Sequence, residues 1–459
     1  MKSKNPIFLR HAALLSCIAL NVSAATSFNW DPSATTGIQY GNGTWDTSST
    51  LFTTDTGATN VAWSNGAGDN IIGFSSSVTG TAPSAVTVTL GTNILLQQIN
   101  MGGSYGSNVI IGGNGNSLTF TSSGTPLLSN NSSSKTITID AVIAGTGVNL
   151  KKSLQGTIIL TQANTYTGTL SVLNGKIVLG TGGSLVAGNA LVLGDSSGGT
   201  SGVFQLGNGG GAVDVTVSSL TTAGTGTANA VVGGSSATST LTINNSGAVN
   251  YGGLLGGSGT NQNNLALAKS GTGTLTLSGA NTYLGTTRVN AGTLALGASG
   301  SLASTTYSVA NGATFDVSAK STYSLASAAV TLDVGSASAG FFNGPTGALT
   351  LGNALTINFS TSTLTNGQTY NLFDYGSQTG DFSSVTLSGS ITGSLVLGSA
   401  DTWTGSFGGY DFTFSETTGI LSLQTSAVPE PSTFALISGA LTLAGCAFRR
   451  NRSRHASAP

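Results

Sequence analysis

Four acidic side chains near the C-terminal end of the sequence could act as general acid and general base. Asp374 and Asp381 form one candidate pair, and Asp411 and Glu416 form the other. Two carboxylates that flank a glycosidic bond can hydrolyse it, and their separation in space decides whether they do. Because single acids in turns are commoner than such pairs, we expect no catalytic residue and no enzymatic activity.

The positions of histidine and cysteine restrict the chemistry further. His11 and Cys17 lie near the N-terminus, and Cys446 and His455 lie near the C-terminus. The long region between them therefore holds no serine–histidine triad, cysteine nucleophile, zinc site or disulfide. We expect neither a metal nor a cofactor.

Three other features are open to a binding or a structural interpretation. The run from Gly112 to Asn116 resembles a calcium-binding β-roll repeat, but Ser117 stands where that motif has an aspartate. The segments 164–166 and 281–283 both read Asn-Thr-Tyr and could be a ligand motif. We favour a structural role for them, with asparagines hydrogen-bonded in ladders and tyrosines packed at turns.

Lysines and tryptophans also allow two interpretations. We interpret Lys152 and Lys269 as solvated residues at the edges of coils. The four tryptophans could stack on sugars or cover the open ends of a repeat array, and we favour the second role. They are Trp30, Trp45, Trp63 and Trp403.

Composition narrows the fold class. Only 6% of the 459 residues are charged, and 68 are glycine. The region between Ala25 and Val428 carries seven basic and fourteen acidic residues, a net charge of about −7. This balance excludes a nucleic-acid binder, which needs a basic patch, and a charge-rich coiled coil.

Strand-like alternation and one internal repeat indicate the architecture. Residues 150–185 and 267–302 align without a gap and share Ala-Asn-Thr-Tyr in register. Within the second copy, Thr274–Leu277 and Thr293–Leu296 alternate polar and apolar residues with period two, the pattern of half-buried strands. A long repeat of short strands separated by glycine and asparagine turns predicts an all-β fold, a right-handed parallel β-helix or solenoid.

Both ends of the sequence have the properties of targeting segments. Basic residues followed by the apolar run 12–20 predict a signal peptide, with cleavage between Ala24 and Ala25. The apolar run 434–448 predicts a short C-terminal transmembrane helix, and the arginines after it should stay on the cytoplasmic side.

The C-terminal segment resembles the PEP-CTERM sorting signal. The resemblance rests on Pro429, Glu430 and Pro431, the apolar run, and the basic cluster that includes Arg449 and Arg450. It implies recognition by an exosortase-type processing enzyme, cleavage near the Pro-Glu-Pro segment, and transfer to the cell surface or release.

The two repeat copies resemble the autotransporter-associated β-strand repeat. The segment 267–302 is the closer copy, whereas Leu154 and Gln155 in the first copy replace Gly271 and Thr272. The resemblance implies a passenger-like β-helix displayed outside the cell. We expect no translocator barrel after the repeats and expect the sorting tail to replace it.

These observations divide the chain into seven predicted regions. They are a signal peptide (1–24), an N-terminal solenoid region with a tryptophan-rich cap (25–149), a first repeat (150–185), a solenoid segment (186–266), a second repeat (267–302), a C-terminal solenoid region (303–427) and the sorting signal (428–454).

The sequence therefore predicts an exported, non-enzymatic surface protein with a structural or adhesive role. The expected partners are the processing enzyme, the inner membrane at least transiently, and an exopolysaccharide or cell-surface matrix. No nucleic acid is expected. The alternatives are a polysaccharide-binding module and a β-helical polysaccharide lyase or hydrolase.

Overall fold

The computed structural model describes residues 25–66, 70–122, 124–360 and 363–426, and these residues form strands, turns and loops without a helix. They fall into two compact units. The first unit holds the described residues up to Asn244, with Val249–Ala266 and Gly279–Tyr283. The second holds Asn245–Ala248, Leu267–Ser278 and the described residues from Leu284 onward.

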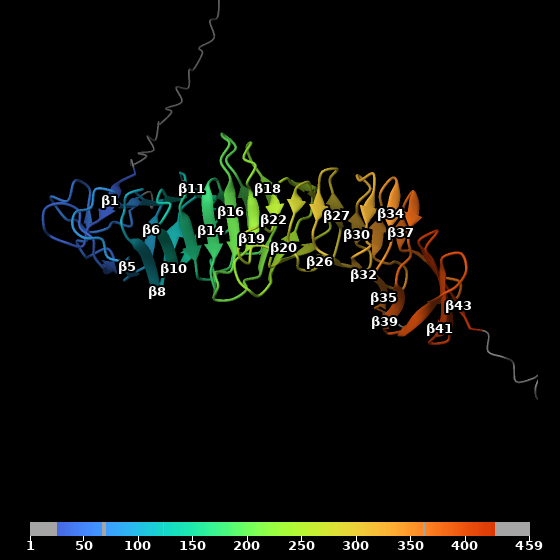
Figure 1. Cartoon of the computed structure of the whole chain (residues 1–459). Coiled ribbons are helices and arrows are strands. Elements are labelled where there is room, and N and C mark those ends of the chain that lie inside the picture. The colour runs from blue at the N-terminus through green and yellow to red at the C-terminus, as the bar shows by residue number, and fades with distance from the viewer. Residues whose placement is uncertain (1–24, 67–69, 123, 361–362, 427–459) are drawn as a thin grey trace, which may run out of the picture. The chain divides into compact units, whose positions relative to one another are not determined.

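Two sheets of stacked strands build most of the first unit (Figure 1). In spatial order, one sheet contains β18 (Ser219–Thr222), β15 (Ala190–Leu193), β13 (Thr169–Val172), β11 (Leu150–Ser153), β9 (Leu127–Asn130), β7 (Gln98–Met101), β4 (Ile71–Phe74), β1 (Ser27–Trp30) and β3 (Phe52–Thr53). The other contains β2 (Gly43–Trp45), β5 (Ala85–Leu90), β8 (Asn108–Phe120), β10 (Thr136–Ala144), β12 (Thr157–Leu160), β14 (Gly175–Leu179), β16 (Gly202–Leu206), β19 (Ala230–Gly233) and β22 (Leu254–Leu255), with β6 (Ile94–Leu96) paired to β8. Further strands of this unit are β17 (Val215–Val217), β20 (Ser239–Asn244), β21 (Val249–Tyr251) and β25 (Ala280–Asn281).

The pairing between these strands is that of a solenoid. Thr136 lies beside Thr157, and Thr157 lies beside Lys176, all in parallel register. The chain thus returns to the same place in the stack after about 20 residues, and each coil contacts its neighbours. The predictions of an all-β fold and of a parallel solenoid are confirmed, while right-handedness stays a prediction.

The alternation in the sequence explains why these segments are strands. In β5, Val86, Val88 and Leu90 are fully buried, whereas Thr87 and Thr89 are half-buried on the other face. Successive side chains of a strand point to opposite faces, so every second residue enters the core between the sheets. The β-branched threonines suit the outer face of such a sheet.

Three sets of parallel strands continue the pattern in the second unit. The first set contains β26 (Thr287–Val289), β29 (Thr306–Val309), β32 (Ala329–Val334), β35 (Ala354–Phe359) and β39 (Ser384–Gly389), and β26 also pairs with the later residues of β23 (Leu265–Ser270). The second contains β24 (Thr274–Leu277), β27 (Thr293–Leu296), β30 (Thr314–Asp316), β33 (Phe341–Asn343) and β37 (Phe373–Asp374). The third contains β31 (Tyr323–Ser324), β34 (Ala348–Thr350) and β38 (Ser377–Thr379), and β28 (Ser301–Leu302) is a further short strand.

The end of the second unit differs from the predicted uniform solenoid. From β39 onward the strands run antiparallel, in the order β40 (Gly393–Leu397), β41 (Thr402–Phe407), β42 (Tyr410–Ser415), β43 (Ile420–Thr425) and β36 (Thr369–Asn371). Gly408 and Gly409 join β41 to β42 with φ of 58° and 80°. Positive φ at both positions favours the tight hairpin turn that reverses the chain.

An aromatic cluster lies at the first strands of both sheets of the first unit. Trp45 of β2 and Trp63 have ring centroids 4.9 Å apart, and Phe52 of β3 lies 5.6 Å from Trp63. Trp30 of β1 lies 5.2 Å from Phe52. The three tryptophans are at most 2% exposed, so none offers a face to a sugar. Their apolar area covers the end of the stack instead.

No helix within the described ranges is long and apolar enough to cross a membrane. The helix expected at residues 434–448 lies outside the described residues, as does the predicted signal peptide. The boundaries of the seven predicted regions stay predictions.

Candidate functional site

The first copy of the repeat buries its lysine inside a cage of main-chain carbonyls. Lys152 is 0% exposed, and its Nζ donates to the carbonyl oxygens of Ser153 at 3.0 Å, Leu154 at 2.5 Å and Asn174 at 2.9 Å. Asn174 lies 22 residues further along the chain, in the next coil. The lysine therefore ties its own turn to the coil that follows.

The second copy repeats this arrangement at the equivalent residue. Lys269 is also 0% exposed, and its Nζ donates to the carbonyl oxygens of Ser270 at 2.7 Å, Gly271 at 2.8 Å and Ala291 at 3.1 Å. The expectation that Lys152 and Lys269 are solvated was wrong. An ammonium carries three hydrogen-bond donors, and here each donor has a carbonyl acceptor. The sequence does not show that these carbonyls surround the lysine.

Opposing effects act on the charge of these lysines. Burial lowers the pKa of Lys152 to about 7 and that of Lys269 to about 8. The carbonyl dipoles around each Nζ favour the charged ammonium, because a neutral amine has one donor fewer. Neither amine reaches solvent, so both lysines are structural and unavailable as a base or a nucleophile.

The Asn-Thr-Tyr segments are structural as well. The Asn164 Oδ1 accepts from Ile143 N at 3.0 Å, and its Nδ2 donates to the carbonyl oxygens of Gln162 and Ser184, each at 3.0 Å. Tyr166 is fully buried. Asn164 thus bonds to the main chain of neighbouring coils, where a ladder of asparagine side chains had been expected.

The second segment has the same bonds. Asn281 Oδ1 accepts from Leu255 N at 2.9 Å, and Asn281 Nδ2 donates to Gly279 O at 2.9 Å. Tyr283 is 0% exposed. The asparagine and tyrosine of each segment therefore serve the stack, whereas the threonines, Thr165 and Thr282, are exposed.

Backbone geometry distinguishes the two repeat copies at one position. Gly271 has φ of 74°, and the equivalent Leu154 has φ of 65° although it has a β-carbon. This left-handed conformation is strained for leucine. Leu154 is also 40% exposed, so its side chain gains little from packing.

The structure does not bring Asp411 and Glu416 together as a catalytic pair. Glu416 is 0% exposed, and its Oε1 accepts from Phe382 N at 2.8 Å and from Trp403 Nε1 at 2.9 Å. Burial raises its pKa, and the nearby Asp381 adds to this rise. Asp374 is exposed at the end of β37. The structure therefore places Asp381, not Asp411, near Glu416, and this glutamate is closed to a polysaccharide.

Asp411 has a different environment. It is exposed, and its Oδ1 accepts from Ser406 Oγ at 2.5 Å and from Ser426 Oγ at 2.7 Å. These hydrogen bonds lower its pKa. Asp411 lies in β42 and is exposed, whereas Glu416 directly follows that strand and is buried, so the two carboxylates do not share a site.

The glycine-rich run from Gly112 to Asn116 forms a bulge within β8. Asn114 and Gly115 have φ of 48° and 84°, and the register with β10 shifts between Asp140 and Val142. The Asp140 Oδ1 accepts from Thr161 Oγ1 and Gln162 Nε2, each at 2.7 Å. Within the described ranges, no group of three or more His, Cys, Asp or Glu residues could hold a metal ion.

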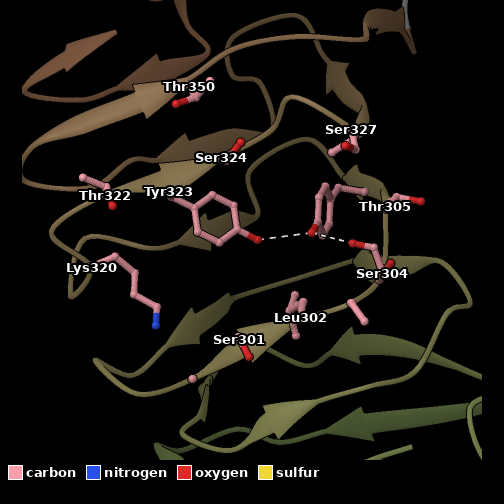
Figure 2. A pocket seen from close by; sticks show the side chains of 14 residues that line it. Ser301, Leu302, Ser304, Thr305, Lys320, Thr322, Tyr323, Ser324, Ser327 and Thr350 are labelled. Carbon is pink, nitrogen blue, oxygen red and sulfur yellow. Dashed lines mark hydrogen bonds between the residues drawn. The ribbon is translucent and has the colours of Figure 1, made fainter. Parts of the chain in front are cut away.

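A cleft of about 490 Å³ in the second unit was not foreseen from the sequence (Figure 2). It lies between the segments around β28, β29 and β31. The Tyr307 hydroxyl donates to Ser304 O at 2.7 Å and lies 3.2 Å from the Tyr323 hydroxyl. Lys320 supplies the cationic group, and serines and threonines supply most other polar groups.

A sequence signal for this cleft exists. Ser304-Thr305-Thr306-Tyr307-Ser308 and Ser321-Thr322-Tyr323-Ser324 are two similar runs. The first leads into β29 and the second contains β31, and these strands belong to different sheets. Runs of this kind resemble ordinary outward-facing strand residues. The two tyrosines meet because the chain turns from one sheet to another between β29 and β31.

The predicted processing residues lie at the edges of the described structure or beyond it. Ala25 is the first described residue and is exposed. Ala24, Pro429, Glu430, Pro431, Arg449 and Arg450 lie outside the described residues.

The fold and the caged lysines define an all-β parallel solenoid that contains a structural repeat. Residues 155–179 and 267–296 match the family described as Passenger-associated-transport-repeat. The chain is also 31% identical over 190 residues to the Adhesin BmaC autotransporter of Brucella suis biovar 1 (strain 1330). This similarity covers 40% of the chain and 5% of that much longer adhesin. No solved structure matches the chain.

The buried lysines predict a pH-dependent stability. The folded-state pKa values of about 7 and about 8 lie below the ordinary value of 10.5, so the unfolded chain binds more protons between these limits. The free energy of unfolding should therefore rise from pH 7 to pH 9, by at most about 1.4 kcal/mol per pH unit for each lysine. Urea denaturation across this range measures the slope.

The matched variants are Lys152→Met and Lys176→Met. Lys176 is half-buried and donates to Gln205 Oε1 at 3.2 Å, so its removal should leave the slope unchanged. Lys152→Met should flatten the rise of unfolding free energy with pH. It should also lower stability at pH 7, because each carbonyl around the lysine loses its donor, at a cost of about 1–3 kcal/mol each. An unchanged slope in Lys152→Met would contradict this assignment.

Leu154→Gly should stabilise the protein. Removing the strained left-handed leucine gains about 1–2 kcal/mol, and the greater chain entropy of glycine offsets about 0.5–1 kcal/mol. Thermal or urea unfolding should show a net gain, whereas the reciprocal Gly271→Leu should destabilise. A loss of stability in Leu154→Gly would show that the leucine side chain contributes more than its exposure indicates.

Proposed function

We propose that this chain is an exported, non-enzymatic protein of the cell surface with an adhesive or structural role in an extracellular polysaccharide matrix. The observation that carries the proposal is the match of both repeat copies to a passenger-associated repeat, together with the similarity to an autotransporter adhesin. The parallel solenoid suits this role, because each added coil extends a surface without a new core.

The environment of the acidic residues favours a non-enzymatic role. A general acid must reach the bond that it protonates, and Glu416 is buried beneath Phe382 and Trp403. Asp374, Asp381 and Asp411 are exposed, and of these three Asp381 lies near the buried Glu416. A polysaccharide lyase or hydrolase is therefore the weaker alternative. The polysaccharide-binding alternative is favoured by the hydroxyl-rich cleft near Tyr323.

The proposed route to the surface uses both terminal segments. The signal peptide would be removed after Ala24, and the apolar run 434–448 would hold the chain in the inner membrane at least transiently. An exosortase-type enzyme would then act near Pro429, Glu430 and Pro431. This route is supported by the order of sequence features at the C-terminus.

Intact-mass measurement of the protein recovered from the cell surface or the medium tests this route. We expect a mass that begins at Ala25 and ends near Pro429–Pro431. A chain in which Arg449 and Arg450 are both replaced by glutamine should be processed poorly at its C-terminus and still lose its signal peptide. A mass that retains residues 434–459 in the wild type would contradict sorting and leave a membrane-anchored protein.

An attachment assay tests the adhesive role. Cells that produce the full chain should remain on a polysaccharide-coated surface severalfold better under flow than cells that lack it. Antibody labelling of intact cells supplies the control that the protein is displayed. Equal attachment of displaying and deficient cells would contradict the proposal.

A further inference from the structure

We infer that the cleft around Tyr307 and Tyr323 binds a short stretch of a saccharide chain. This inference rests on the proposed surface function and names the site and ligand class through which it would act. Figure 2 shows Tyr323 and Lys320 directed into the same space, with Thr322 and Ser324 on the segment that carries Tyr323. The volume of about 490 Å³ falls in the range of small-ligand sites, about 300–1,000 Å³.

The aromatic side chain in this cleft is held in place before any ligand arrives. The Tyr323 hydroxyl lies 3.2 Å from the Tyr307 hydroxyl, which is itself bonded to Ser304 O at 2.7 Å. Behind the ring, Phe315 and Phe342 lie 6.3 Å and 6.1 Å away in centroid distance. Tyr323 is half-buried, so part of its surface remains open to the cleft. A fixed ring loses little entropy when a ligand packs on it.

The polar groups of the cleft match the hydroxyls of a sugar. Hydroxyl groups both donate and accept, and Thr305, Thr322, Ser324 and Ser327 are exposed around the ring. Lys320 Nζ donates to Ala298 O at 2.8 Å, which leaves two of its three donors for a ligand hydroxyl or carboxylate. A pyranose has apolar C–H groups that can pack on the tyrosine ring and hydroxyls around its own edge. The cleft therefore provides a partner for both kinds of group.

Other ligand classes fit the cleft poorly. The described lining contains no carboxylate, which a divalent cation would need. One lysine is a weak match for a phosphate, which is usually held by several donors or an arginine. A lipophilic ligand would require a mainly apolar lining. A peptide added as a strand would need a longer edge than β31, which has two residues.

Binding by the purified, processed protein to immobilised dextran and alginate tests the inference. Dextran is neutral and alginate carries carboxylates. Comparing them shows whether the cleft binds neutral saccharides, acidic saccharides or both. We expect Tyr323→Ala to weaken binding at least about tenfold, and Tyr323→Phe to weaken it less because the ring remains. Lys320→Gln should weaken binding to alginate more than to dextran. The matched control Lys176→Gln, on another coil, should bind as the wild type does.

A second variant keeps the test decisive if Tyr323→Ala fails to fold. Thr305→Trp adds bulk to an exposed residue of the lining without removing a core contact, and it should block the cleft. Thermal unfolding confirms that each variant is folded. Binding of Thr305→Trp at wild-type strength, or no binding of either polysaccharide by the wild type, would overturn the inference. One further result would overturn the inference. In it, the wild type binds an unrelated immobilised protein but neither polysaccharide, and Thr305→Trp abolishes that binding.

The same variants separate this inference from the proposed surface function. If Thr305→Trp loses saccharide binding while displayed wild-type protein does not promote attachment, the cleft assignment holds and the adhesive function is wrong. If attachment is normal and Thr305→Trp binds saccharides as the wild type does, the adhesive function holds and the cleft assignment is wrong.

Discussion

In both copies of the repeat, a lysine ammonium enclosed by three carbonyl oxygens connects one coil to the next. Lys152 and Lys269 each bond the two residues that follow them and one residue of the next coil. A buried ammonium without partners would cost several kcal/mol. The next coil must therefore place a carbonyl oxygen beside the lysine Nζ. This requirement sets the path of the turn and its distance from the neighbouring coil. The alternating strands then supply apolar area on both sides of that turn.

The glycines near each lysine have physical roles that follow from this cage. Gly271 adopts a positive φ that directs its carbonyl to Lys269 Nζ. A β-carbon on Gly292 would lie 2.4 Å from Gly273 O and 2.7 Å from Gly271 O, so no larger residue fits without displacing these carbonyls. Gly175 stands in the same relation to the first copy. Leu154 is the one residue of these positions that is not glycine. Its positive φ indicates that the carbonyl cage requires this conformation even where the residue type disfavours it.

The sequence predicts much of the fold and little of the candidate site. Period-two alternation, as in Val86 to Leu90, identifies strands because burial on one face leaves a local pattern. The role of Lys152 is invisible locally, since one of its partners lies 22 residues away. The antiparallel end was signalled by Gly408-Gly409, a turn that sequence analysis could have weighed. The cleft depends on the placement of Tyr307 beside Tyr323, two residues in strands of different sheets, which the local sequence does not reveal.

The polar groups of the described residues have two different roles. Inside, Lys152, Asn164 and Glu416 bond to main-chain or indole groups of the chain itself. Buried groups used in this way stabilise the stack, and burial withdraws them from chemistry with a substrate. Outside, threonine and serine hydroxyls remain available, with few charges among them. In the second unit, Tyr323 and Lys320 line a cleft in which an aromatic ring lies among such hydroxyls. Under the proposed function, binding at one such cleft would be weak and would gain strength when many copies act together on a polymer.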